Sequence, residues 1–185
     1  MYEESPRVKL LYKQFQGPLL GLGTDLSNLI KEGRILDAGC GIGDLVSELQ
    51  RLNPETYGID IESDMIDGIE GLAGAKQRVL YPDKVVGGDI AEPPFPNEYF
   101  DTIMSNTLFA STEKRAFKFL EMGREIPSIE KVQEEMVNGI YRVCKKGGLY
   151  LIFDNKSIAN LPIGDFSQLY PSNNERFGNI RILRK

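Results

Sequence analysis

The fold of this chain is decided by the stretch Ile35-Leu-Asp37-Ala-Gly39-Cys40-Gly41-Ile-Gly43-Asp44. It begins as a short apolar strand, passes through three glycines at alternate positions and continues into a helical pattern. Glycine is needed where the backbone turns sharply and where a ligand must approach it without an intervening Cβ atom. The N–H groups at the start of the helix favour a carboxylate or a phosphate. The stretch therefore predicts a ligand site at the end of the strand, with a purely structural glycine turn as the alternative.

Short apolar runs alternate with amphipathic stretches along the rest of the chain, which predicts a mainly parallel sheet flanked by helices. The first five expected strands lie at the spacing of strand–helix–strand units. Strands are expected at 34–38, 56–60, 84–88, 102–105, 149–153 and 179–184. Helices are expected from Ser5-Pro6 toward Phe15, over 25–31, over 44–52, from a cap at Ser63, and over 128–144.

Length and composition limit the classes of function. The chain has 185 residues and a mass of 20.8 kDa, enough for one well-buried domain. With 22 Lys and Arg against 27 Asp and Glu, the formal charge of −5 argues against a nucleic-acid or anionic-membrane partner. Two cysteines and the absence of an expected secretion signal or membrane span favour the cytoplasm. The chain has no histidine, which excludes mechanisms that need a histidine base, nucleophile or metal ligand.

An acidic residue at the end of the second expected strand strengthens the ligand prediction. Asp60 follows the glycine turn by about twenty residues, the spacing at which a carboxylate can accept both hydroxyls of a ribose. Capping of the next helix is its alternative role. In a dinucleotide-binding G-x-G-x-x-G turn the third glycine stands where this chain has Asp44, which would repel a diphosphate. Asp37 likewise suits a cationic group. The expected ligand has a ribose, little negative charge and a positive group.

Four motifs, in the same order over residues 33–153, resemble those of class I S-adenosylmethionine-dependent methyltransferases. The resemblance implies an α/β fold: a doubly wound, mostly parallel sheet of six to seven strands, the last antiparallel, with helices on both faces. The motifs are Asp37-Ala-Gly39-Cys-Gly41-Ile-Gly43; Gly58-Ile-Asp60; Gly88-Asp89-Ile90 with Pro94-Phe-Pro96 and Tyr99-Phe-Asp101; and Tyr141-Arg-Val-Cys-Lys-Lys-Gly147-Gly148-Leu-Tyr-Leu-Ile152.

The resemblance further implies a site for S-adenosylmethionine, with S-adenosylhomocysteine as the product, and no metal. It assigns the methionine end to the glycine motif, the ribose and adenine to two acidic positions, and the sulfonium to the end of the fourth strand. The residues assigned to the methionine end are Asp37, Gly39, Cys40, Gly41 and Gly43. Asp60 is assigned to the ribose and Ile61 to the adenine face. Asp89 and Ile90 are assigned to the adenine edge, and Ser105 to the sulfonium. Core packing for Ile61, turn formation for Asp89 and capping for Ser105 are the structural alternatives.

We expect one methyltransferase domain over 1–185. Within it, 1–32 form an N-terminal helical cap, 33–154 the cofactor-binding core, 107–127 a substrate-side insertion and 155–185 a C-terminal hairpin. The turn of that hairpin is expected at Tyr170-Pro-Ser-Asn-Asn174. Apolar residues of the insertion form an expected lid over a small substrate, or alternatively pack on the sheet: Leu108, Phe109, Phe117, Phe119 and Met122.

Methyl transfer is an in-line displacement at a carbon that a positive sulfur already activates, so the protein mainly aligns the nucleophile and excludes water. Candidates for a catalytic role are Asn106 and Tyr12, followed by Glu113 and Tyr170. Tyr12 packs alternatively in the core. The expected acceptor is a small molecule. A protein lysine or N-terminal amine is the alternative acceptor, and a non-catalytic cofactor-binding subunit of a methyltransferase complex is the alternative function.

Overall fold

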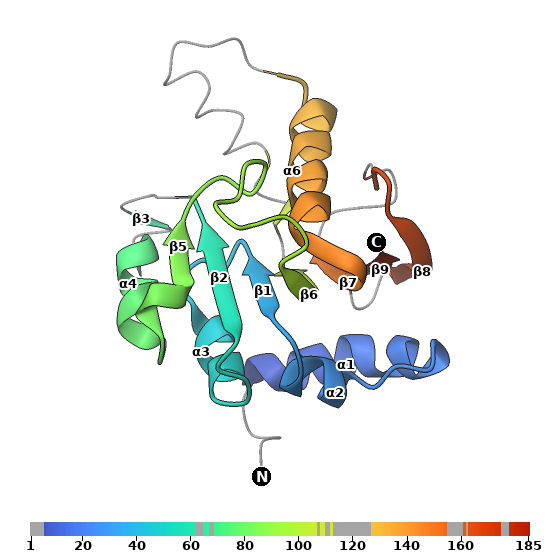
Figure 1. Cartoon of the computed structure of the whole chain (residues 1–185), viewed down its shortest axis with the longest axis horizontal. Coiled ribbons are helices and arrows are strands. Elements are labelled where there is room, and N and C mark those ends of the chain that lie inside the picture. Colours follow the sequence, from blue (N-terminus) through green and yellow to red (C-terminus); the bar gives the residue numbers. More distant parts are fainter. Residues whose placement is uncertain are drawn as a thin grey trace.

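A seven-stranded sheet forms the centre of the molecule in the computed structural model (Figure 1). The described residues are 6–61, 65–66, 69–106, 108–109, 112, 127–154, 161, 163–174 and 178–185. The strand order is β5-β2-β1-β6-β7-β9-β8, and β9 runs antiparallel to both neighbours while the pairs from β5 to β7 are parallel. The strands are β1 Ile35–Ala38, β2 Thr56–Asp60, β5 Val85–Gly87, β6 Phe100–Asn106, β7 Cys144–Asp154, β8 Ser167–Asn174 and β9 Gly178–Arg184.

Strands β2 and β5 lie on one side of β1, and β6, β7, β9 and β8 lie on the other. This order confirms the doubly wound topology with seven strands. Two short strands, β3 Met65–Ile66 and β4 Ile69–Glu70, pair separately from it.

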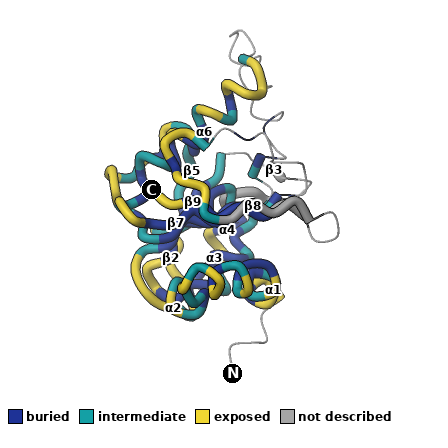
Figure 2. The backbone as a smooth tube through the Cα atoms, turned by 90° about the vertical axis from the view of Figure 1, so that its right-hand side faces the viewer, coloured by how far each residue is buried: buried dark blue, intermediate teal, exposed yellow. Residues whose placement is uncertain are grey.

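Helices cover both faces of the sheet, and side-chain alternation decides which residues meet them. Figures 1 and 2 show α1, α2 and α3 on one face and α6 on the opposite face. Ile35 and Met104 point toward the α1 face and Leu36 and Ile103 toward the α6 face, because successive strand residues alternate. The helices are α1 Pro6–Gly21, α2 Leu26–Lys31, α3 Asp44–Gln50, α4 Gly71–Arg78 and α6 Ile129–Val143, with the short 3-10 helix η1 at Pro82–Lys84.

The predicted helix over 128–144 is confirmed, and its packing follows from its sequence. The Ser128 Oγ atom accepts the N–H of Lys131 at 3.2 Å, as expected of an N-cap residue. Val132, Met136 and Ile140 recur at helical spacing and are almost completely buried. Gly139 lies on the same helix where a Cβ atom would come within 2.1 Å of the Ile90 carbonyl oxygen. The helix therefore packs directly on the backbone that precedes β6.

Three sequence expectations were wrong in position. The first helix extends beyond Phe15 to Gly21. The helix expected from Ser63, a residue outside the described set, begins only at Gly71, after the β3–β4 pair. Tyr170–Asn174 belongs to β8 rather than to a turn, since backbone pairing with β9 outweighs the turn preference of Pro, Ser and Asn.

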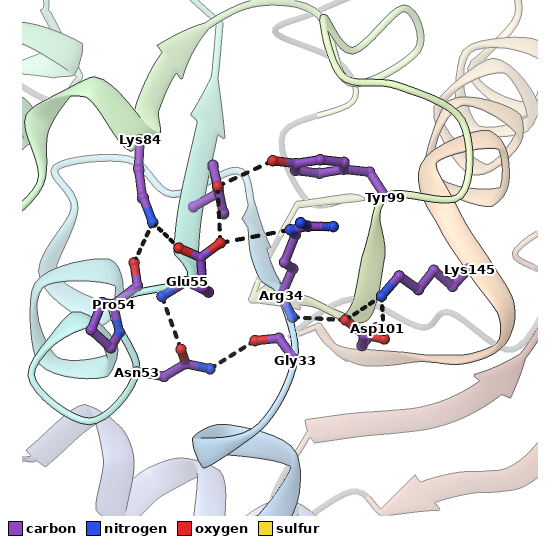
Figure 3. Close-up of polar contacts among 10 residues, drawn as sticks. Gly33, Arg34, Asn53, Pro54, Glu55, Lys84, Tyr99, Asp101 and Lys145 are labelled. Carbon is purple, nitrogen blue, oxygen red and sulfur yellow. Dashed lines mark hydrogen bonds and ion pairs between the residues drawn. The ribbon is translucent and has the colours of Figure 1, made fainter.

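Charged side chains pair with one another at the amino ends of the strands (Figure 3). Arg34 lies 3.6 Å from Glu55, which also pairs with Lys84. Lys145 Nζ donates to both oxygens of Asp101 at 2.7 and 2.8 Å, and the Arg34 N–H donates to the same carboxylate at 2.8 Å. These five residues, the amino-end network, link the starts of β1, β2, β5, β6 and β7.

Candidate functional site

The glycine turn joins β1 to α3 at the carboxyl edge of the sheet. The N–H groups of Gly39 and Cys40 donate to the Ile59 carbonyl oxygen at 2.9 and 3.1 Å, which fixes the turn against the end of β2. Gly41 has φ +53°, and no heavy atom lies within 4 Å of the position its Cβ atom would take. A ligand can therefore approach the backbone at Gly41.

Gly43 has a different reason to be glycine. Its φ is +77°, and a Cβ atom there would lie 3.1 Å from the Ala75 Cβ atom of α4. Close packing of α3 and α4 requires glycine at this position, in contrast to the expectation that it serves ligand approach.

Asp60 holds the glycine turn with both carboxylate oxygens. Oδ2 accepts the Gly41 N–H at 2.6 Å and Oδ1 accepts the Ile61 N–H at 2.7 Å. Burial raises the pKa of Asp60, and these two backbone hydrogen bonds oppose the increase. Each oxygen keeps a further lone pair for a ligand hydroxyl. The carboxylate is thus fixed in place beside the turn before any ligand arrives.

Asp37 is a buried acid at the end of β1, with 3% of its surface exposed. It lies two residues after Ile35, so its side chain points to the α1 face of the sheet. Burial and the nearby Asp60 charge raise the pKa of Asp37 to about 7, while the charge of Arg7 on α1 opposes them. The site therefore holds a carboxylate that gains from a cationic ligand group.

The segment after β5 carries Asp89 and Ile90. Asp89 Oδ1 accepts the Ala91 N–H at 2.9 Å, so the residue forms a local turn. Ile90 is 5% exposed and packs in the core under α6. The Gly88 N–H donates to the Asp60 carbonyl oxygen at 2.9 Å, which places this segment next to the end of β2.

At the end of β6, the predicted residues Ser105 and Asn106 differ in their contacts. The Ser105 hydroxyl is buried and shares a 2.8 Å hydrogen bond with the Tyr150 hydroxyl, so it is engaged within the protein. Asn106 lines a hollow on the α1 face. A Cβ atom on Gly39 would lie 2.9 Å from Leu108 Cδ1, so Leu108 covers the first glycine of the turn.

The hollow lies between α1, the start of α3 and the ends of β6 and β7. It is shallow and open to solvent, with a volume of about 20 Å³, and is lined mostly by apolar side chains. Its lining residues are Arg7, Leu10, Leu11, Gln14, Phe15, Leu45, Met104, Ser105, Asn106, Leu151 and Phe153.

Some residues were missed in the sequence. Arg7 escaped notice because no motif in the sequence marks it, yet it lines the hollow. Asp154, fully buried at the end of β7, accepts the Phe109 N–H at 2.9 Å and anchors the segment after β6. Asp154 could have been found in the sequence as an acidic residue at the end of an expected strand.

Other candidates fall away from the site or outside the described residues. Tyr12 packs half-buried against the core on the α1 face. Glu113, Phe117, Phe119, Met122 and the side chain of Tyr170 lie outside the described set.

The two thiols are buried, and burial raises the pKa of both Cys40 and Cys144. Neither is therefore a ready thiolate nucleophile. Among the described residues no group of three or more acidic, cysteine or histidine side chains comes together as a metal site. No helix within the described ranges has the length and apolar character of a membrane span.

Comparison with known proteins agrees with this geometry. Residues 36–152 match the family model described as a methyltransferase domain. Sterol 24-C-methyltransferase from Gibberella zeae is 28% identical over 127 residues, which cover 68% of this chain and 28% of that protein. Demethylmenaquinone methyltransferase from Roseiflexus castenholzii is 35% identical over 95 residues, covering 50% and 37% respectively. The chain thus spans about a third of the length of these relatives.

The fold is shared with solved structures over nearly the whole chain. A TehB-like S-adenosylmethionine-dependent methyltransferase from Corynebacterium glutamicum superposes with a TM-score of 0.58 at 20% identity. The match covers 97% of this chain and 99% of that one. The matching family model, the strand order and the glycine and acidic motifs at one sheet edge lead to one conclusion: the chain belongs to the class I S-adenosylmethionine-dependent methyltransferase family.

Proposed function

We propose that this chain transfers the methyl group of S-adenosylmethionine to a small molecule with a mainly apolar body. The observation that carries the proposal is the hollow on the α1 face, which opens beside the ends of β6 and β7. Leu11, Phe15 and Met104 give it an apolar wall, while Gln14 and Asn106 supply hydrogen-bonding groups. Small-molecule sites combine these two features.

The cofactor occupies the neighbouring carboxyl edge in this proposal. Asp60 accepts the ribose hydroxyls through the lone pairs left free by its backbone bonds. Asp37 and the Gly39 backbone take the methionine ammonium, and Gly41 allows close approach. Asp89 and the Ile90 N–H hold the adenine edge. The residues present fit the group, since the buried Asp37 suits its positive end and open space lies over Gly41.

The chain's own contribution to the reaction is alignment and exclusion of water. When bound, the cofactor supplies a methyl group activated by a positive sulfur. The Ser105–Tyr150 hydrogen bond fixes the end of β6, so that Asn106 holds an acceptor in line from the hollow. Burial raises the pKa of Tyr150, which keeps its hydroxyl neutral and acting as a hydrogen-bond partner. An acceptor with an available lone pair needs no strong base.

The names of the two curated relatives support an apolar acceptor, since one acts on a sterol and the other on demethylmenaquinone. Lysine and terminal-amine methylation remain the alternative outcome of the test below.

The test supplies S-adenosylmethionine labelled in its methyl group to the protein together with separated small-molecule and protein fractions of a cell extract. We expect label in the organic-soluble small-molecule fraction. The Leu11→Phe variant, which fills the hollow, should lower that transfer at least about tenfold while S-adenosylhomocysteine affinity stays unchanged. Leu20→Phe is the matched control, because Leu20 lies on the same helix with 56% of its surface exposed. Label confined to protein would overturn the small-molecule assignment.

A further inference from the structure

Asp154 is a buried acid at the carboxyl end of β7 that the proposed function does not use. Its exposed fraction is 0%. It lies four residues after Tyr150 on the same strand, so its side chain points to the α6 face of the sheet. A carboxylate is costly to bury unless hydrogen bonds hold it, and Asp154 Oδ2 accepts the Phe109 N–H at 2.9 Å. The two residues are 45 positions apart, so the bond ties the end of β7 to a distant segment of the chain.

Phe109, in the segment after β6, is fixed at its N–H, its side chain and its carbonyl oxygen. The side chain is buried and packs in the core under α6. The carbonyl oxygen accepts the hydroxyl of Thr112, which is itself buried, at 2.6 Å. The N–H donates to a carboxylate, and hydrogen bonds to a carboxylate are stronger than those between neutral groups. Asp154 therefore makes a major contribution to the placement of this segment.

Leu108, the neighbour of Phe109, lies on the glycine turn. Its Cδ1 atom is 2.9 Å from the position that a Cβ atom on Gly39 would take. The turn is itself fixed at this point, because the Gly39 N–H donates to the Ile59 carbonyl oxygen. Leu108 is half-buried and packs against the core on the α6 face, whereas the hollow lies on the α1 face. Leu108 therefore borders the first glycine of the turn on the side opposite the hollow.

We propose that Asp154 is a positioning residue, which holds Leu108 as an apolar wall of the cofactor site opposite the hollow. Asp154 touches neither cofactor nor acceptor and acts through Phe109. The inference rests on the proposed function, because it needs the cofactor at the glycine turn and the acceptor in the hollow. An apolar wall at this place excludes water from the turn, which strengthens the polar contacts of the bound cofactor and slows its release. The wall also leaves the α1 face as the direction from which the acceptor approaches.

The rates at which S-adenosylhomocysteine binds to and leaves the protein, measured by stopped flow, test the proposal. Asp154→Ala releases Phe109 and with it Leu108. It should raise the dissociation rate at least about tenfold, the loss expected for a hydrogen bond to a charged group, while the association rate stays within about threefold. Asp154→Asn keeps an oxygen that can accept the Phe109 N–H, so it should restore part of the slow release. A loss of folded protein would reduce the amount of bound ligand without speeding its release.

Leu108→Ala shows whether Asp154 acts through the wall. It should also raise the dissociation rate, and the double variant should release the ligand within about twofold of the faster single variant, because both changes remove the same contact. Asp101→Ala is the matched control, since Asp101 also accepts a backbone N–H, that of Arg34 at 2.8 Å, but at the amino ends of the strands. Its dissociation rate should stay within about twofold of the unaltered protein, as expected for a distant site. Thermal melting of all variants checks the fold.

An unchanged dissociation rate in Asp154→Ala would overturn the proposal, and so would effects of Asp154→Ala and Leu108→Ala that multiply independently in the double variant. If Asp154→Ala does not fold, the other two variants decide. Faster release from Leu108→Ala with slower release from Asp154→Asn supports the proposal, and an unchanged rate in Leu108→Ala overturns it. Failure of the unaltered protein to bind S-adenosylhomocysteine would instead reject the cofactor site and the proposed function with it.

Discussion

Among the described residues, charged side chains are paired with one another at the amino ends of the parallel strands, whereas Asp37 and Asp60 at the carboxyl ends are not. At the amino ends, Arg34, Glu55 and Lys84 pair with one another, and Asp101 receives Lys145 (Figure 3). At the carboxyl ends, backbone N–H groups donate to Asp60, and Asp37 is buried without a hydrogen bond from the described residues. The charges at the amino ends are paired within the protein, whereas Asp37 and Asp60 at the carboxyl ends have no cationic side chain bonded to them in the described part of the chain.

The pKa values follow the same division. Although partial burial acts in the opposite direction, hydrogen bonds from Lys145 and the Arg34 backbone lower the pKa of Asp101. Burial raises the pKa of both Asp37 and Asp60, and neither the Arg7 charge near Asp37 nor the two backbone hydrogen bonds to Asp60 cancel the increase. Charge pairing at the amino ends stabilises the fold, whereas the buried acids at the carboxyl ends cost stability and, under the proposed function, bind the cofactor. Four changes test this division.

The largest effect is expected for Gly139→Ala. Gly139 lies on α6, against the backbone of the segment that follows β5 at the carboxyl end of the sheet. The new Cβ atom would lie 2.1 Å from the Ile90 carbonyl oxygen, so α6 or the segment that carries Asp89 and Ile90 must shift. We expect the free energy of unfolding to fall by about 3 kcal/mol, measured by urea denaturation, with weaker S-adenosylhomocysteine binding. Gly17→Ala is the control, since nothing lies within 4 Å of its Cβ position on α1. Equal effects of the two variants would contradict the packing argument.

Asp60→Ala should lower the affinity for S-adenosylhomocysteine by about 1.5–3 kcal/mol, the value of hydrogen bonds to a charged group. The loss arises because the ribose hydroxyls lose their acceptor and Gly41 loses the group that fixes its N–H. Titration calorimetry measures the change, and circular dichroism confirms the fold. An unchanged affinity would show that Asp60 only shapes the turn.

The raised pKa of Asp37 predicts a pH dependence with a definite sign. The unfolded chain releases this proton near 3.8 and the folded protein near 7, so ionisation costs the unliganded fold stability as pH rises from about 4 to 7. Binding of a cationic group needs the ionised form, so affinity should rise by up to about tenfold per pH unit toward pH 7 and then level off. Calorimetry from pH 5.5 to 8.5 measures this rise.

The Asp37→Asn variant distinguishes the pH dependence that Asp37 causes from that of other titrating groups. The variant should bind weakly and keep only the smaller slope that comes from Asp60, whose pKa burial also raises. If the variant retained the full slope, another group would be responsible.

The smallest effect is expected at the amino ends. Asp101→Asn breaks a pair whose side chains are each 37% exposed, so solvent screening limits the loss to about 1 kcal/mol in the free energy of unfolding. Affinity for S-adenosylhomocysteine should not change. A loss of binding without a loss of stability would reverse the assignment of the two ends.

Much of the fold could be predicted because local signals and tertiary packing agree. The β1–turn–α3 unit combines an apolar strand, required glycines and a helix start, and α6 has both its Ser128 cap and a regular buried stripe. The prediction of an element was wrong where the local signals and the tertiary packing conflict. Residues 170–174 carry turn-forming types but pair with β9, because an available strand edge supplies backbone hydrogen bonds that the local preference cannot foresee.

The site divides in the same way. The sequence determined that Asp37, Asp60 and Asp89 lie at or just after the ends of strands of one parallel sheet, and carboxyl ends of parallel strands share an edge. The tertiary structure alone decided that Gly43 serves helix packing, that Ser105 is engaged with Tyr150, and that Arg7 lies beside the glycine turn. Strand order follows from repeated local patterns, whereas contacts between α1 and α3 depend on how two helices far apart in sequence pack, which no local pattern encodes.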